Sequence, residues 1–142
     1  SLGCCLAESV GARLILTGKS PLPPEEEWPH RLAHHENHDP VSSKILRIKT
    51  LREKGGEVLA FGVDAADKQG MQEVIDRAEE KFGPIVGIIH AAGQTKSLIN
   101  PLQHFNKAHC DSLFRPKIQG LLVLADLFRD RELDFCLLTS SL

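Results

Sequence analysis

The sequence predicts an α/β fold in which helices cover both faces of a parallel sheet. Three observations lead to this prediction. Short apolar runs typical of buried strands alternate with amphipathic stretches typical of helices. Glycine or proline residues separate many of these segments. Small or polar residues follow the strand runs, at the end of a parallel sheet where ligands bind. Strands that alternate with helices favour parallel pairing.

Four apolar runs predict the strands. Each run is short, rich in β-branched residues or leucine, and bounded by residues that favour turns. Because the runs show little polar alternation, we expect strands that are buried on both faces. In chain order, the predicted strands are residues 13–17, 57–63, 85–89 and 134–139.

Helices are predicted in three stretches between these strands. Residues 43–54 place apolar side chains on one face and end at two glycines, which favours a helix stop. Asp67 is a predicted N-cap for a second helix, whose apolar residues recur every three or four positions before Gly83-Pro84. The third stretch, 101–129, predicts a helix with a kink at Pro116.

A proline-rich segment between the first strand and the first of these helices predicts a surface excursion. It begins near Pro21 and ends at Pro40. His30, His34 and His38 follow one another at intervals of four residues, a spacing that can hold a metal ion on a helix face. We expect a solvated polar segment and no metal site.

Composition limits the classes of function. With 142 residues, 42% of them hydrophobic, the chain suits one domain spanning residues 1–142. The net charge of −2 and the absence of basic runs argue against binding to nucleic acid or to a membrane surface. No apolar run approaches the length of a membrane span, so we expect a cytoplasmic protein. The four cysteines match neither a disulfide framework nor a zinc motif.

Two motifs carry the functional information. His90-Ala-Ala-Gly93 follows the third predicted strand, and Lys117 lies within the helical motif Arg115-Pro-Lys-Ile-Gln-Gly120. With Ser140-Ser141 after the fourth strand, these residues resemble the short-chain dehydrogenase/reductase superfamily. They resemble more closely the ketoreductase domain of modular polyketide synthases, which places its lysine on the helix before the serine. The resemblance covers Leu2 to Leu142 and implies a Rossmann-like, doubly wound parallel sheet.

The resemblance implies a role for each matching residue. Lys117 and Ser141 would be catalytic, since the lysine would bind the nicotinamide ribose and the serine the substrate carbonyl. The separation between Lys117 and Ser141 matches the family pattern better than that to Ser140. The residues that would bind NADPH, including its pyrophosphate, ribose 2′-phosphate and adenine, are Gly3, Lys19, Ser20, Asp64, Ala65, Ala91, Ala92 and Gly93. A turn residue is the alternative for Asp64, and a solvated loop residue is the alternative for Lys19.

The implied reaction is the NADPH-dependent reduction of a β-ketoacyl group on an acyl carrier protein. The other domains of the same synthase would be further partners. The family's proton donor is a tyrosine, and the sequence contains none; by the family pattern, the tyrosine would follow Leu142. We therefore expect the chain alone to be inactive. The alternative is a noncatalytic remnant that acts as a structural or dinucleotide-binding module. Thr95-Lys-Ser97 replaces a motif associated with hydroxyl stereochemistry, which leaves the product configuration open.

The resemblance also predicts an incomplete sheet. By the family pattern, the chain begins inside the glycine-rich turn, so the central first strand is missing. The strands at Arg13 and Ile85 would flank that position. We expect these two strands either to pair directly in a strained way or to leave open edges, and either outcome favours aggregation.

Overall fold

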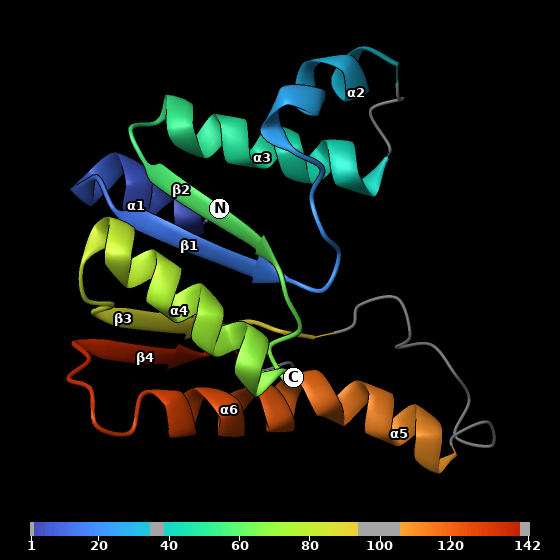
Figure 1. Cartoon of the computed structure of the whole chain (residues 1–142), viewed down its shortest axis with the longest axis vertical. Coiled ribbons are helices and arrows are strands. Elements are labelled where there is room, and N and C mark those ends of the chain that lie inside the picture. Colours follow the sequence, from blue (N-terminus) through green and yellow to red (C-terminus); the bar gives the residue numbers. More distant parts are fainter. Residues whose placement is uncertain (1, 35–38, 94–105, 140–142) are drawn as a thin grey trace. The chain divides into compact units, whose positions relative to one another are not determined.

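The computed structural model describes residues 2–34, 39–93 and 106–139. Its strands pair in parallel as two separate two-stranded sheets, β1 with β2 and β3 with β4 (Figure 1). This confirms the predicted α/β fold with parallel strands. The strands are β1 (Arg13–Gly18), β2 (Glu57–Gly62), β3 (Gly87–His90) and β4 (Phe135–Leu138).

Helices precede or follow every strand. All described helices are short, and none is long and apolar enough to cross a bilayer. The elements are α1 (Leu2–Val10), a 3₁₀ turn (Glu25–Glu27), α2 (Trp28–His34), α3 (Pro40–Glu53), α4 (Lys68–Phe82), α5 (Lys107–Phe114), a π-helix (Arg115–Gln119) and α6 (Gly120–Leu127). They fall into two compact units, residues 1–62 and 63–142, which are described separately.

The core of the first unit lies between α1, α3 and one face of the β1–β2 pair. Ile45, Ile48 and Leu51 form the buried stripe of α3, as their spacing predicts. They pack with Ala7 from α1 and Val58 from β2. The apolar residues of β1 that join this core are Leu14 and Leu16, two positions apart on the same face of the strand.

The proline-rich excursion is more ordered than a solvated segment. Trp28 begins α2, joins the core of the first unit and is only 6% exposed. Its indole N–H donates to the carbonyl of Pro23 (2.9 Å), and Arg52 lies over the ring while binding Glu25 through two hydrogen bonds. The prediction of a solvated excursion is therefore wrong at this point. The buried indole and these polar contacts together anchor the segment.

His30 and His34 lie on the exposed side of the excursion. The rings of His30 and His34 stack with centroids 4.1 Å apart, on the same face of α2. His38 lies outside the described residues. Within the described ranges, no group of three histidine, cysteine or acidic side chains could hold a metal ion.

Asp39 fixes the start of α3. Its carboxylate accepts hydrogen bonds from the backbone N–H and the hydroxyl of Ser42 (both 2.9 Å) and pairs with Arg31. Pro40 occupies the first helical position, where no backbone donor is needed. These donors stabilise the carboxylate, so the pKa of Asp39 falls from 3.8 to about 2. The helix therefore starts three residues earlier than the sequence pattern predicted.

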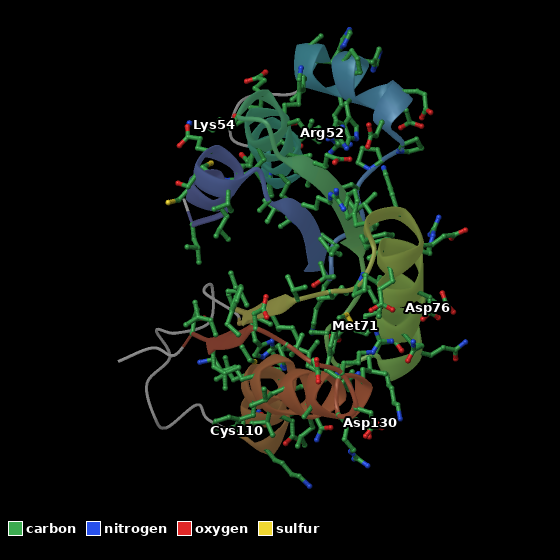
Figure 2. All side chains as sticks on the ribbon, turned by 90° about the vertical axis from the view of Figure 1, so that its left-hand side faces the viewer. Arg52, Lys54, Met71, Asp76, Cys110 and Asp130 are labelled. Atoms are coloured by element: carbon green, nitrogen blue, oxygen red, sulfur yellow. The ribbon has the colours of Figure 1, made fainter. Side chains whose placement is uncertain are left out.

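In the second unit, α4 matches its prediction in both ends and face. Asp67 caps the helix by accepting from the N–H of Gly70 (3.2 Å), and Gly83 ends it with a positive φ. Figure 2 shows Met71 on the side of α4 that faces the strands and Asp76 on the opposite side. The buried stripe comprises Met71, Val74, Ile75 and Ala78.

Two ion pairs join α4 to the α6 region. Lys68 at the start of α4 pairs with Asp126, and its hydrogen bond lowers the pKa of that carboxyl. Glu79 near the end of α4 pairs with Arg131, whose guanidinium also lies over the ring of the buried Phe128. Both ends of α4 are thus tied to the end of α6 or to the residues just after it.

The predicted kink at Pro116 is a π-helical segment. The N–H of Gly120 bonds to the carbonyl of Arg115, five residues earlier. Proline has no N–H to give to the preceding turn, so the helical hydrogen-bond ladder is interrupted here. The wider turn absorbs this defect and lets α5 continue into α6 without a break in the chain of helical residues.

Amide hydrogen exchange tests the division of the sheet. In the described residues, each strand has one hydrogen-bonded strand neighbour, so only alternate amides along β1 and β3 are paired with another strand. We expect a pattern of slow and fast exchange that alternates along Leu14–Thr17 and Ile88–His90. Uniformly slow exchange in both strands, measured by NMR on the isolated chain, would contradict two separate sheets.

The cap at Asp39 predicts a specific pH dependence. Because the pKa of Asp39 is lower in the folded protein than its ordinary value of 3.8, the charged cap stabilises the fold above that pH. The contribution is lost as the pH falls through about 2. In Asp39→Asn, the side chain can still cap but does not titrate. The stability advantage of the wild type over this variant, measured by urea unfolding, should therefore shrink between pH 5 and pH 2; an advantage independent of pH would contradict it.

Candidate active site

Three segments of the second unit meet beside the carboxyl end of β3. They are the turn after β2, the residues that end and follow β3, and the π-helix with the first residue of α6. Gly120 marks the closest approach: a Cβ atom at this position would lie 3.1 Å from Cε1 of His90 and 3.2 Å from Cβ of Ala65. Only a residue without a side chain fits this approach without displacing its neighbours.

Asp64 shapes the turn after β2. Its carboxylate accepts from the N–H of Ala66 (3.0 Å), and its carbonyl accepts from the N–H of Asp67 (2.8 Å). The guanidinium of Arg115 in the π-helix pairs with the same carboxylate at 3.6 Å. The turn alternative for Asp64 is therefore correct as a description of its local structure. Contact with a bound adenine remains a prediction.

Lys117 extends from the π-helix to the residues that follow β3. Its Cε atom lies 3.6 Å from the position that a Cβ atom of Gly93 would occupy. Gly93 and Ala91 are exposed and Ala92 is half-buried, so the backbone here is accessible. The structure therefore brings the lysine and the small residues, predicted separately, to one place.

His90 connects this place to β4. Its side chain is 8% exposed, and Nε2 lies 3.3 Å from the backbone carbonyl of Lys117. Its own carbonyl accepts from the N–H of Thr139 (3.0 Å) and from the Thr139 hydroxyl (3.3 Å). The sequence motif contains His90, but spacing alone gave no reason to assign it a role. The same holds for Arg115, which stands two positions before Lys117.

The remaining predicted site residues lie elsewhere or outside the described chain. Gly3 is in the first turn of α1, and a Cβ atom there would make an ordinary contact of 3.4 Å with Leu51. Lys19 and Ser20 are exposed and follow β1 in the first unit. Ser141 lies outside the described residues.

The second unit can accept a dinucleotide by its chemistry. A nicotinamide dinucleotide needs accessible backbone and small residues beyond the ends of parallel strands, together with donors for its ribose hydroxyls. Exposed Ala91 and Gly93 supply the first requirement. The ammonium group of Lys117 supplies a charged donor beside them. The described residues therefore fit this class of cofactor.

Comparisons with known proteins identify the family. A family model described as the KR domain matches residues 2–142. Polyketide synthase PksM of Bacillus subtilis is 31% identical over 140 residues, which cover 96% of this chain and 3% of that protein. A phenolphthiocerol/phthiocerol polyketide synthase of Mycobacterium tuberculosis is 33% identical over 137 residues, which cover 96% of this chain and 7% of that protein. The chain thus spans a small part of these relatives.

Solved structures show the same fold. A ketoreductase domain from the bacillaene assembly line is 25% identical with a TM-score of 0.77, covering 99% of this chain and 29% of that one. An N-terminal ketoreductase from the macrolactin assembly line is 26% identical with a TM-score of 0.69, covering 99% and 26%. The architecture is therefore Rossmann-like. Because the KR model matches almost every residue, the chain belongs to the KR domain family of polyketide synthases, within the short-chain dehydrogenase/reductase superfamily.

Proposed function

We propose that this chain carries the NADPH-binding part of a ketoreductase that reduces β-ketoacyl groups on an acyl carrier protein. The observation that supports the proposal most directly is the side chain of Lys117 beside Gly93, at the carboxyl end of β3. This is the edge of a parallel sheet where dinucleotides bind. Membership in the KR domain family supports the class of reaction.

In the proposed reaction, the cofactor supplies a hydride and the chain supplies binding and charge. Lys117 would donate hydrogen bonds to the nicotinamide ribose and contribute positive charge where negative charge develops on the substrate oxygen. Ser141 would donate a hydrogen bond to the substrate carbonyl. The proton requires a separate acid. Since the chain has no tyrosine, we expect the chain alone to bind the cofactor without turnover.

The other predicted cofactor contacts divide by the part of NADPH they would bind. Gly3 would allow backbone to approach the pyrophosphate, and Lys19 with Ser20 would bind the ribose 2′-phosphate. Asp64 and Ala65 would contact the adenine. The N–H of Ala66 and the guanidinium of Arg115 hold the Asp64 carboxylate in place, and such a carboxylate can still accept a bond from an adenine amino group.

The proposed substrate and partners follow from the relatives. The curated relatives are named as polyketide synthases, and this chain matches a few per cent of their length. We propose that the chain works beside other domains of one cytoplasmic synthase, on an acyl chain tethered to a carrier protein. A noncatalytic dinucleotide-binding module is the second candidate, because the described residues fit the cofactor whether or not a reaction follows.

Calorimetric titration with NADPH tests the cofactor site. Replacing Lys117 by Gln removes one charge-assisted hydrogen bond, so we expect NADPH affinity to fall roughly tenfold or more. Lys107→Gln, at an exposed position in α5, changes the same charge and should leave the affinity unchanged. Equal losses in both variants would show that Lys117 acts only through net charge and would contradict the proposed site.

A second titration tests the selectivity for NADPH over NADH. If Lys19 binds the 2′-phosphate, Lys19→Gln should weaken NADPH binding roughly tenfold and leave NADH binding unchanged, because NADH lacks that phosphate. Parallel losses for both cofactors would exclude this role.

The two candidate functions differ in turnover. The polypeptide that supplies the missing acid should oxidise NADPH when given a β-keto thioester, whereas a noncatalytic module should bind NADPH and leave it unoxidised. The absorbance of NADPH at its reduced-nicotinamide band reports the difference directly.

A further inference from the structure

We propose that His90 is the positioning residue for Lys117. By donating from Nε2 to the backbone carbonyl of Lys117, His90 holds the lysine-bearing turn against the ends of β3 and β4. The inference rests on the proposed role of Lys117 in NADPH binding. It assigns to His90 a function separate from contact with cofactor or substrate.

The burial of His90 shows that this hydrogen bond matters. The side chain is 8% exposed, and a buried imidazole without a partner would be costly. The carbonyl of Lys117 can only accept, so Nε2 carries the proton in this contact. The imidazole ring of His90 is therefore held as a donor to one backbone carbonyl, that of Lys117. His90 itself lies three residues before Gly93.

Lys117, the partner of His90, lies where the helical hydrogen-bond ladder between α5 and α6 is irregular. Pro116 cannot donate a backbone hydrogen bond, and the ladder changes to the π pattern over Arg115–Gln119. A segment with a disrupted ladder can change its geometry at lower cost than a regular helix. An outside donor to the Lys117 carbonyl restrains this segment at the residue that carries the ammonium group.

The other contacts of His90 hold it between the end of β4 and the start of α6. Its carbonyl accepts from both the N–H and the hydroxyl of Thr139, which ties it to the end of β4. On the other side of the imidazole ring lies Gly120, the first residue of α6. A Cβ atom at Gly120 would lie 3.1 Å from Cε1 of His90, so a side chain there would keep α6 farther away. The strand ends and the π-helix are thus joined through one residue.

This arrangement explains how the lysine reaches the strand end. The side chain of Lys117 is exposed, and its aliphatic stem extends to Gly93. An exposed lysine has many rotamers, so its placement depends on its backbone. Loss of the His90 hydrogen bond would allow the turn to shift, and the ammonium group would move away from the strand end without unfolding the unit.

A double-mutant cycle on the full chain tests the inference, with NADPH affinity measured by calorimetry. His90→Leu keeps a buried apolar side chain and removes the donor, so affinity should fall roughly tenfold, the value of one hydrogen bond. In His90→Gln, the amide nitrogen is as many bonds from Cα as Nε2 is in histidine. This variant should therefore restore most of the NADPH affinity. In the Lys117→Gln background, His90→Leu should cause no further loss.

A matched control separates positioning from general destabilisation. Val74→Ala removes buried volume from α4, outside the candidate site, and should lower stability without coupling to Lys117. The inference is overturned if His90→Leu and Lys117→Gln act additively, if His90→Gln fails to restore affinity, or if Val74→Ala shows the same coupling.

Amide exchange keeps this test independent of cofactor binding. If the wild-type chain fails to bind NADPH, the proposed function is wrong, but the positioning role can still be measured. His90→Leu should speed exchange selectively across residues 115–120, and His90→Gln should reverse the change. Val74→Ala should speed exchange across the whole second unit. If His90→Leu instead speeds amide exchange equally across the second unit, His90 contributes only to packing and the positioning role is wrong.

Discussion

The parallel register between β3 and β4 is the constraint on which the candidate site depends. Gly87 pairs with Phe135, and a side chain at Gly87 would overlap the phenylalanine ring, so the ring in this position needs a residue without a side chain opposite it. A slip by one residue would set the ring against Ile88 and turn every later side chain to the opposite face. With the register fixed, His90 pairs with Leu138, and the residues after both strands emerge at the same edge. All later contacts of the site build on that alignment.

The features that sequence predicted well are those determined by local chemistry. The cap at Asp67, the stop at Gly83 and the apolar stripe from Met71 to Ala78 each follow from neighbouring residues, and the structure confirms all three. The place of the small residues after β3 also follows from local sequence, because a short strand followed by alanine and glycine needs no distant partner to be recognised. Their contact with a cofactor remains a prediction. The role predicted for Lys117 came from the family resemblance. Its spacing in the sequence alone does not distinguish it from other exposed lysines.

The features that sequence missed depend on contacts between distant segments. Trp28 stands in a proline-rich stretch that looks solvated, and only its packing with α3 and β2 shows that it belongs to the core. Pro116 predicted an interruption but not the π-helical form, which depends on how the flanking helices pack. His90 and Arg115 contact partners 27 and 51 residues away, so no local pattern could have predicted these contacts. The part of the site that includes Ser141 remains a prediction.

The glycine at the start of α6 carries a consequence for protein engineering. Alanine is the better helix former by about 1 kcal/mol, so a design method that scores helix propensity would replace Gly120. The same exchange would press a methyl group against Ala65 and the imidazole of His90, so these neighbours would have to shift. Helix propensity and close packing therefore make opposite demands on this one residue, and a score based on propensity alone would misjudge it.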